Sequence, residues 1–378
     1  MPNILYLHNH SDISGGERSL LNLWQHLNPT FKKFVILPDE GPLATQAKNI
    51  DVDVTINAFP KLSLLNFFKI QKTITFLKNF IKEHDINIVH SYSPRNNLIA
   101  AFSCKPLNIP VIWHERNLLN DKEPDQSKQF ITLPSAIICN SNAVAERFKQ
   151  NGIIPAKVQV IINGVDINIF RSNLAHTLKI KYENNLEEYK IVGSFGNLNI
   201  RKRPEYLLSI AESVIKKIPK TKFLIVGDQF PQDNGERIQQ LKNLTKSMHL
   251  ENNIIFTGFV ENVIDYINAC DLIVHVAKKE ACGRSIIEAQ ACGKPVIALA
   301  DGGNPELIKN AITGILISQD TVENFTNNIY ELLRNDDLRH ALGQHARMHA
   351  GKFFDITKNT RQTEFLYEQL LEKVKKTN

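Results

Sequence analysis

The sequence of 378 residues has few of the features that mark small stapled proteins or membrane-embedded ones. Its five cysteines form an odd, scattered set without a C-x-x-C pair: Cys104, Cys139, Cys270, Cys282 and Cys292. This set argues against a disulfide framework and a zinc site, and it suits a reducing compartment. No apolar run reaches the roughly 18 residues of a membrane span, so we expect no transmembrane helix.

An excess of charge of one sign is also lacking. Lys and Arg number 45 against 39 Asp and Glu, which leaves a net charge of +6. Without a helix-turn-helix or a dense basic stripe, this bias does not indicate a nucleic-acid partner. It suits an anionic small ligand or an anionic membrane surface. The first residues lack the basic segment and cleavage site of a signal peptide, so we expect a cytoplasmic protein.

What is present is an ordinary globular composition, with 43% hydrophobic and 22% charged residues. Short apolar strands alternate with amphipathic helices, which predicts βαβ units, parallel sheets and an α/β fold. The expected strands are residues 3–8, 34–37, 52–56, 86–91, 111–114, 136–140 and 158–162, then 190–195, 222–226, 254–256, 271–276, 295–299 and 314–317. The expected helices are residues 94–102, 142–150, 203–218, 236–248, 285–291, 322–334 and 357–375.

The alternation dissolves into polar residues at 172–188, a candidate domain boundary. We therefore expect one domain at residues 1–170, a second at 171–355, and a C-terminal segment at 356–378. Each half begins with a strand followed by a glycine-containing loop.

The first glycine loop is Ser14-Gly15-Gly16-Glu17, directly after the first strand. Two glycines let a ligand approach the backbone closely, and the next helix offers free N–H groups and the positive end of its dipole. The pattern is not G-x-G-x-x-G, so a nicotinamide fingerprint is absent. An ordinary strand–helix turn is the alternative.

A second candidate site lies between the strand at 271–276 and the helix that runs to Ala291. Glu280 follows the carboxyl end of a parallel strand, where α/β sheets bind ligands. Gly283, Arg284 and Ser285 form the first helical turn, whose N–H groups suit a phosphate. Glu288, one turn further, suits ribose hydroxyls. The alternative is that Glu280 is a loop charge and Glu288 faces solvent.

A third candidate runs from Gly193 to Pro204. Arg201, Lys202 and Arg203 follow a strand end, which favours a phosphate site. Pro204 suits the first turn of the next helix. A solvated basic loop is the alternative.

Together these motifs resemble the glycosyltransferases of family 4, which have the GT-B fold of two Rossmann-like domains with parallel sheets facing a central cleft. The resemblance covers about residues 3–370. Its most specific part is the E-x7-E block of Glu280 and Glu288 with the trailing Ala-Cys-Gly-Lys-Pro-Val. The other matching motifs are Gly15 to Arg18, Gly41-Pro42-Leu43, His90-Ser91, His114-Glu115, Asn140-Ser141-Asn142, Ile162-Asn163-Gly164-Val165-Asp166, Val226-Gly227-Asp228 and Phe256-Thr257-Gly258-Phe259.

The resemblance implies a nucleotide-sugar donor, UDP- or GDP-linked, in the second domain and a glycan or glycolipid acceptor in the first. The C-terminal helix is expected to cross back onto the first domain. Catalytic roles fall on Glu280 at the transferred sugar, Lys202 at the diphosphate and His114 near the reacting centre. The full set of implied donor-binding residues is Gly15, Gly16, Asn197, Arg201, Lys202, Phe259, Val260, Glu280, Cys282, Gly283, Arg284, Ser285 and Glu288.

The resemblance also implies a retaining hexosyltransferase, with bacterial surface-polysaccharide, lipopolysaccharide, capsule or glycolipid synthesis as the setting. Lys202 and a helix N-terminus can stabilise the departing diphosphate without a metal, so we expect no metal cofactor. Asp51-Val52-Asp53 has the letters of a metal motif but begins a strand in the acceptor half.

Two positions depart from the family pattern. Asn197 stands where the family usually has an Arg that clamps phosphate with the lysine, and Cys282 stands where it usually has Phe. These departures keep two alternatives open: a non-catalytic nucleotide-sugar-binding protein, and a GT-B epimerase or hydrolase.

Residues 61–82 interleave apolar side chains with five lysines, and no acidic residue occurs between Asp53 and Glu83. A basic amphipathic helix in the acceptor half suits an anionic lipid surface. It would hold the protein peripherally at the inner face of the cell membrane. A core helix with a lysine-rich outer face is the alternative.

Overall fold

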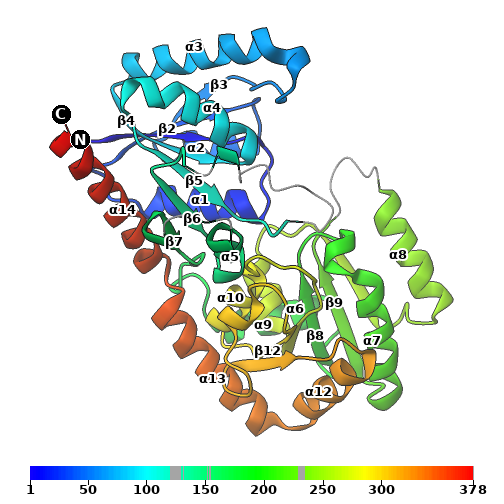
Figure 1. Ribbon diagram of the computed structural model, residues 1–378. Coiled ribbons are helices and arrows are strands. Elements are labelled where there is room, and N and C mark those ends of the chain that lie inside the picture. Colours follow the sequence, from blue (N-terminus) through cyan, green and yellow to red (C-terminus); the bar gives the residue numbers. More distant parts are fainter. Residues whose placement is uncertain (120–128, 131, 151, 153–154, 229–234, 378) are drawn as a thin grey trace. The chain divides into compact units, whose positions relative to one another are not determined.

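The computed structural model describes residues 1–119, 129–130, 132–150, 152, 155–228 and 235–377. The chain forms two compact units (Figure 1). Unit 1 comprises Met1–Gly164 and Ile356–Asn378, and unit 2 comprises Val165–Asp355. Each unit is a parallel sheet with helices on its faces, which confirms the predicted α/β class. Residues 165–170, which the sequence-based boundary places with the first half, group with unit 2.

The sheet of unit 1 has the strand order β3-β2-β1-β4-β5-β6-β7. All of its strand pairs are parallel; for example, Leu5 of β1 pairs with Phe34 of β2 and with Val89 of β4. The strands are β1 Asn3–Leu7, β2 Lys32–Leu37, β3 Asp53–Ile56, β4 Ile86–Tyr92, β5 Val111–Glu115, β6 Ala136–Cys139 and β7 Val158–Val160.

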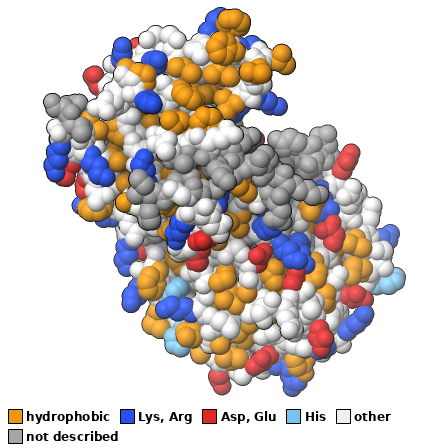
Figure 2. Space-filling model, viewed as in Figure 1, with side chains coloured by type: hydrophobic (Ala, Val, Ile, Leu, Met, Phe, Trp, Pro, Cys, Tyr) orange, Lys and Arg blue, Asp and Glu red, His pale blue; other side chains and the backbone are white. Residues whose placement is uncertain are grey.

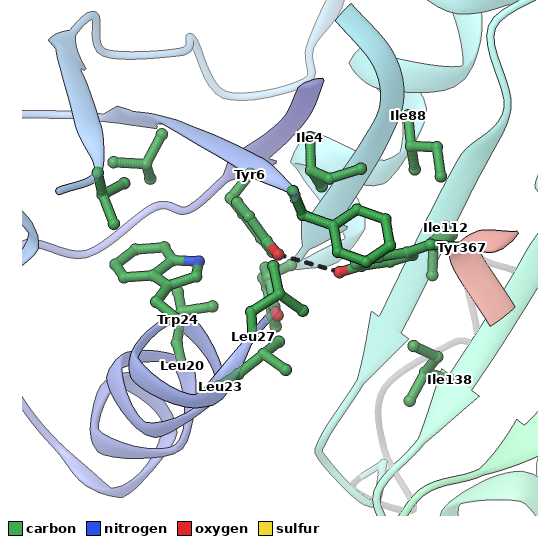
Figure 3. Packing of buried hydrophobic residues seen from close by; sticks show 14 of the residues in the cluster. Ile4, Tyr6, Leu20, Leu23, Trp24, Leu27, Ile88, Ile112, Ile138 and Tyr367 are labelled. Atoms are coloured by element: carbon green, nitrogen blue, oxygen red, sulfur yellow. Dashed lines mark hydrogen bonds between the residues drawn. The ribbon is translucent and has the colours of Figure 1, made fainter. Parts of the chain in front are cut away.

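The main core of unit 1 lies where three helices cover one face of this sheet. Helices α1 (Gly15–His26), α2 (Pro42–Lys48) and α14 (Ile356–Thr377) contribute its buried apolar side chains. Figure 3 shows Tyr6 of the sheet between Trp24 of α1 and Tyr367 of α14. Helices α3 (Phe67–Glu83) and α4 (Pro94–Cys104) pack together on the opposite face, and α5 (Asn142–Gln150) follows β6 (Figure 1).

The sheet of unit 2 has the strand order β10-β9-β8-β11-β12-β13. Its strands are β8 Lys190–Phe195, β9 Thr221–Val226, β10 Ile254–Gly258, β11 Leu272–His275, β12 Val296–Leu299 and β13 Gly314–Ile317. Its helices are α6 Leu174–Glu183, α7 Pro204–Lys217, α8 Glu236–Ser247, α9 Val263–Ala269, α10 Arg284–Ala291, α11 Asn304–Leu307, α12 Val322–Arg334 and α13 Asp336–Phe353. Buried side chains of α7, α8 and α12 build the core on one face.

Four helices of unit 2 were not expected from the sequence: α6, α9, α11 and α13. The polar stretch 172–188 contains α6, which is capped by Asn173 and ion-paired to α9 through His176 and Asp265, 2.6 Å apart. Only Ile180 of α6 is buried, which explains its weak apolar pattern. Helix α13 was also missed, and its Arg347 donates to the backbone carbonyls of Ile167, Phe170 and Ala291.

None of the helices in the described ranges has both the length and the apolar character that crossing a lipid bilayer demands.

Candidate functional site

Each unit places its candidate residues where the strand order of its sheet reverses. In unit 2 the chain runs outward from β8 to β10 and then returns to the other side of β8 with β11. In unit 1 the same reversal separates β1 from β4. Loops leave the carboxyl ends of two neighbouring strands in opposite directions at such a point, which opens a crevice for ligands.

In unit 2, the loop after β8 brings Lys202 back over the strand end. Asn199 accepts a hydrogen bond from the backbone N–H of Lys202 at 3.1 Å and so closes a single 3-10 turn. Gly196 has a φ of +135°, and a Cβ built there would lie only 3.3 Å from Cε of Lys202. Because Gly196 has no side chain, the stem of Lys202 can pack directly against its backbone.

The ammonium of Lys202 meets the carboxylate of Glu280, which comes from the loop after β11. Nζ lies 2.6 Å from Oε2, and Nε2 of His275 at the end of β11 lies 3.5 Å from the same oxygen. Glu280 is only 6% exposed. Burial alone would raise the pKa of Glu280, but Lys202 and His275 together hold it well below its usual range. Glu280 is therefore a buried, ionised hydrogen-bond acceptor.

His275 remains neutral in this group, because burial and the nearby Lys202 ammonium lower its pKa. Its Nδ1 lies 3.4 Å from Oγ of Ser285 in the first turn of α10. Sequence reasoning missed His275, although a polar residue that ends the apolar strand Leu272–His275 was a signal for it.

The backbone of the Glu280 loop is fixed by the turn at 301–303. The carbonyl of Glu280 accepts a hydrogen bond from Gly303 N–H at 2.8 Å, and Lys279 N–H donates to Asp301 at 2.6 Å. Gly302 has a φ of +58°, and a Cβ there would overlap the Glu280 carbonyl oxygen. The position of Glu280 thus depends on a glycine twenty-two residues further along the chain.

Helix α10 presents the second half of the E-x7-E block. Gly283 is its N-cap, and the N–H groups of Arg284 and Ser285 belong to its first turn. Nη2 of Arg284 lies 2.7 Å from Oε1 of Glu288, which is 8% exposed. The burial of both glutamates excludes the interpretation that they are solvated loop and helix charges. Cys282 is also buried, at 7% exposure.

The three cations of the 201–203 run take different directions. Lys202 turns to Glu280, whereas Arg203 turns away: it donates to the Val276 carbonyl and pairs with Asp320 at 3.0 Å. The Arg201 side chain is exposed. Asn197 is half-buried and lines a small cavity with Lys202 and His275. Of the two arginines in this run, Arg203 is thus committed to Asp320 and Arg201 is not.

Phe259 and Val260 follow β10, the edge strand of unit 2, which lies two strands from β8. The Phe259 ring is 63% exposed and Val260 is half-buried. Gly258 turns the chain with a φ of +68°. These two residues stand at the same carboxyl edge of the sheet as Lys202.

In unit 1, Gly15 and Gly16 open helix α1. Glu17 accepts a hydrogen bond from Ser14 N–H at 3.0 Å and pairs with His8 at 3.3 Å. Arg116 was not recognised as a site residue from the sequence. Its guanidinium donates a hydrogen bond to the Gly16 carbonyl and lies over the ring of Tyr92 in β4. Burial lowers the pKa of His8 to about 4, so Glu17 faces a neutral imidazole.

His114 lies on β5 beside the rings of His90 and Tyr92. The His114 centroid lies 5.2 Å from that of His90 and 4.8 Å from that of Tyr92, in stacked arrangements. Burial and the Arg116 charge lower the pKa of His114 well below its usual value. Gly15, Gly16 and His114 therefore belong to one group in unit 1, and the other predicted site residues belong to unit 2.

The Asp51-Val52-Asp53 motif lies at the start of the edge strand β3, where Asp53 pairs with Lys32 at 3.1 Å. Within the ranges that the structure describes, no three His, Cys, Asp or Glu side chains gather as metal ligands would. Metal independence of the reaction stays a prediction.

Comparison with known families gives two matches in sequence order. "Glycosyltransferase Family 4" matches residues 13–169, and "Glycosyl transferases group 1" matches residues 177–349. Together the two matches span the motifs of both units.

Individual relatives extend over nearly the whole chain. The UDP-Gal:alpha-D-GlcNAc-diphosphoundecaprenol alpha-1,3-galactosyltransferase of Escherichia coli is 25% identical, over 94% of each chain. The crystal structure of Anabaena HepE in complex with UDP and glucose matches with a TM-score of 0.84 at 22% identity, over 97% of this chain and 99% of that one. A glycosyltransferase from Rickettsia africae matches with a TM-score of 0.87 at 22% identity, over 98% of each chain. These likenesses confirm the predicted GT-B fold class.

Proposed function

Because the chain belongs to the family 4 type of glycosyltransferases, we propose that it moves a sugar from a nucleotide-diphosphate sugar to a glycan or lipid-linked acceptor. The observation that carries this proposal is the Lys202–Glu280 pair at the strand reversal of unit 2, with the first turn of α10 beside it. A cation, a buried carboxylate and the N–H groups of a first helical turn suit a diphosphate joined to a sugar.

The proposed roles follow from charge. Lys202 holds the diphosphate and stabilises its charge as the bond to the sugar breaks, which lowers the barrier without a metal. Glu280 stays ionised and accepts hydrogen bonds from sugar hydroxyls, so it is not the proton donor. Lys202 is 2.6 Å from Glu280, so a bound diphosphate must share the ammonium with that carboxylate.

The remaining roles rest on position in unit 2. Glu288 binds the ribose hydroxyls, with Arg284 orienting its carboxylate at 2.7 Å. Gly283 and Ser285 offer backbone donors, and Phe259 flanks the base. The reaction is proposed to retain the anomeric configuration, with a hexosyl group transferred.

UDP is the proposed nucleotide, with GDP as the second choice. The E. coli relative is named for UDP-Gal, and the HepE complex contains UDP and glucose. The same relative acts on a diphosphoundecaprenol, which supports a lipid-linked acceptor and a setting in bacterial surface-polysaccharide or glycolipid synthesis.

A thermal-shift screen with UDP-, GDP- and ADP-sugars tests the donor site. A ligand at 100 times its dissociation constant stabilises the fold by about 2.7 kcal/mol, so the correct donor raises Tm by several degrees. Lys202→Met removes most of this shift, and Lys216→Met on an exposed helix face serves as the control. If no nucleotide sugar raises Tm of the wild-type protein, the donor site is assigned wrongly.

A non-catalytic nucleotide-sugar-binding protein is the second candidate, favoured by Asn197 in place of the family's arginine. Glu280→Ala distinguishes the two, because an enzyme loses its turnover of donor whereas a binding protein has none to lose. Analysis of the products identifies an epimerase or a hydrolase, which changes or releases the sugar without an acceptor.

Membrane association at the cytoplasmic face is proposed through the tip of unit 1 formed by residues 61–72. Leu64 and Leu65 are 93% and 97% exposed, and Phe68 is 81% exposed. Lys69 and Lys72 are exposed on the same first turns of α3. Figure 2 shows apolar side chains gathered where α3 lies, with basic ones at the margin. An exposed apolar tip ringed by lysines matches an anionic bilayer surface.

Co-sedimentation with vesicles containing phosphatidylglycerol tests this proposal. Because each lysine near an anionic surface contributes about 1 kcal/mol, Lys69→Gln with Lys72→Gln lowers the binding constant by at least tenfold. Leu64→Ser with Leu65→Ser weakens binding at every salt concentration, and Lys216→Gln is the control. Vesicle binding that is unchanged in both double variants contradicts a lipid partner. So does a wild-type dimer that these substitutions dissociate, because the apolar tip then binds a second copy of the chain.

A further inference from the structure

Three buried side chains of unit 1 form a hydrogen-bonded chain that ends at the half-buried His114. The hydroxyls of Tyr6 and Tyr367 lie 3.1 Å apart, as the dashed line in Figure 3 marks. The Tyr367 hydroxyl lies 2.6 Å from Nδ1 of His90, and Nε2 of His90 lies 3.0 Å from Nδ1 of His114. Nε2 of His114 is buried and finds no hydrogen-bond partner in the described ranges.

Both imidazoles of this chain are neutral. Burial, followed by the Arg116 charge, lowers the pKa of His90 and of His114 well below the usual value. Each hydroxyl and each neutral ring therefore contributes one proton, and all the hydrogen bonds must point the same way.

The buried end of the chain decides that direction. If the protons point toward His114, Tyr6 donates to Tyr367, Tyr367 donates to His90 Nδ1, and His90 Nε2–H donates to His114 Nδ1. Every donor then has an acceptor except His114 Nε2–H. In the reverse direction the Tyr6 hydroxyl has a proton and no acceptor in the described ranges, at 0% exposure. Each direction leaves one donor without an acceptor, His114 Nε2–H in the first and the Tyr6 hydroxyl in the second. Tyr6 lies fully in the core whereas His114 as a residue is partly exposed, so the unmatched donor is less costly at His114 and the first direction prevails.

We infer that Tyr6 and Tyr367 fix both histidines as Nε2–H tautomers, so that His114 offers a neutral N–H donor and Tyr367 of α14 is a positioning residue. The group that His114 binds is therefore an uncharged oxygen acceptor. This last step rests on the proposed function and on the position near the reacting centre that the family resemblance implies for His114, where the acceptor is a hydroxyl of the transferred sugar. His114 does not serve as a general base, because its free nitrogen already carries a proton.

The tautomers can be read directly from ¹⁵N-labelled histidine in the ligand-free protein at pH 7, by two-bond ¹H–¹⁵N correlation. His90→Asn and His114→Asn assign the signals. The expected result is a protonated Nε2 and an unprotonated Nδ1 in both rings. An Nδ1–H tautomer in either ring overturns the inference. The measurement needs no substrate, so it is independent of a failure to find transferase activity.

Tyr367→Phe tests the positioning role. It removes the donor to His90, so we expect the ring ¹⁵N shifts of His90 to move and kcat to fall about five- to tenfold, the effect of one hydrogen bond. The donor KM stays within twofold. Tyr6→Phe keeps the Tyr367–His90 bond and has a smaller effect, and Tyr182→Phe, whose ring is exposed on unit 2, is the control. If Tyr367→Phe lowers stability but leaves the ring ¹⁵N shifts of His90 unchanged, Tyr367 is not a positioning residue.

Discussion

Glu280 stays ionised although it is buried, and burial disfavours the charged form of a carboxylate. Its carboxylate is almost fully buried, and the contacts with Lys202 and His275 compensate for the lost hydration. Because the pKa of Glu280 is held below its usual range, the pair stabilises the fold at neutral pH. That stability is complete above the unfolded pKa of about 4.3 and is lost as pH falls toward the folded pKa.

Glu280→Gln is therefore expected to lower the free energy of unfolding at pH 7 by about 1–3 kcal/mol, since Lys202 loses its charged partner. The difference from the wild-type protein narrows as pH is lowered from 5 to 3, because Glu280 of the unfolded wild-type chain takes up a proton that the folded, ion-paired carboxylate does not bind. Urea unfolding across this range measures both effects. Glu251→Gln, at an exposed carboxylate, is the control, and a difference that does not depend on pH contradicts the assigned charge.

Two glycine turns position the loop that carries Lys202. Gly196 follows β8 and Gly227 follows β9, with φ values of +135° and +136°. A Cβ at Gly227 would overlap the carbonyl oxygen of Gly196, so the two turns are in direct backbone contact. The ends of the strands can approach this closely only without side chains, which is why the site loop depends on both glycines.

Gly227→Ala is expected to cost about 3 kcal/mol of stability, from backbone strain and from displacement of Gly196. We also expect Gly227→Ala to weaken nucleotide binding, because Gly196 belongs to the loop that carries Lys202. Gly235→Ala is the matched control, because Gly235 also has a positive φ, +85°, but no atom lies within 4 Å of its Cβ position. The control costs about 1 kcal/mol from strain alone. Far-UV circular dichroism during urea unfolding measures the loss of stability in each variant. Equal losses in the two variants contradict the backbone contact between Gly227 and Gly196.

Unit 1 is built from both ends of the sequence. It comprises the first 164 residues and the last 23, and Leu366, Tyr367 and Leu370 of α14 lie in its main core. Unit 1 therefore cannot complete its core until the C-terminus has been made. The same helix supplies the hydroxyl that orients His90.

Leu370→Asp tests this closure. Leu370 is 4% exposed, and a charge there is expected to destabilise unit 1 by about 4 kcal/mol or more. Both tryptophans, Trp24 and Trp113, lie in unit 1, so tryptophan fluorescence during urea unfolding reports on this unit alone. Phe365→Asp on the same helix, at 56% exposure, is the control. A fluorescence midpoint that does not move contradicts the role of α14.

The parallel sheets and most of the helices follow from the periodicity of the sequence, because buried strands read as short apolar runs. Helix α6 has a single buried residue, so its sequence did not show the periodic apolar pattern of a helix. The Glu280–Glu288 block was recognisable because its motif is local. Arg116 and Tyr367 were not, because each acts through a partner far away in the sequence. His275 lies close to Glu280 in the sequence, but it belongs to no local motif that marks it as a site residue.

By itself the sequence determined the α/β class, the glycosyltransferase family and the residue types at the candidate site, since all of these depend on local order along the chain. Only the tertiary structure decided that Lys202 pairs with Glu280 and that Arg203 turns to Asp320. The physical reason is that charges and hydroxyls are paired by the approach of strand ends and helices, and that approach depends on packing rather than on sequence distance.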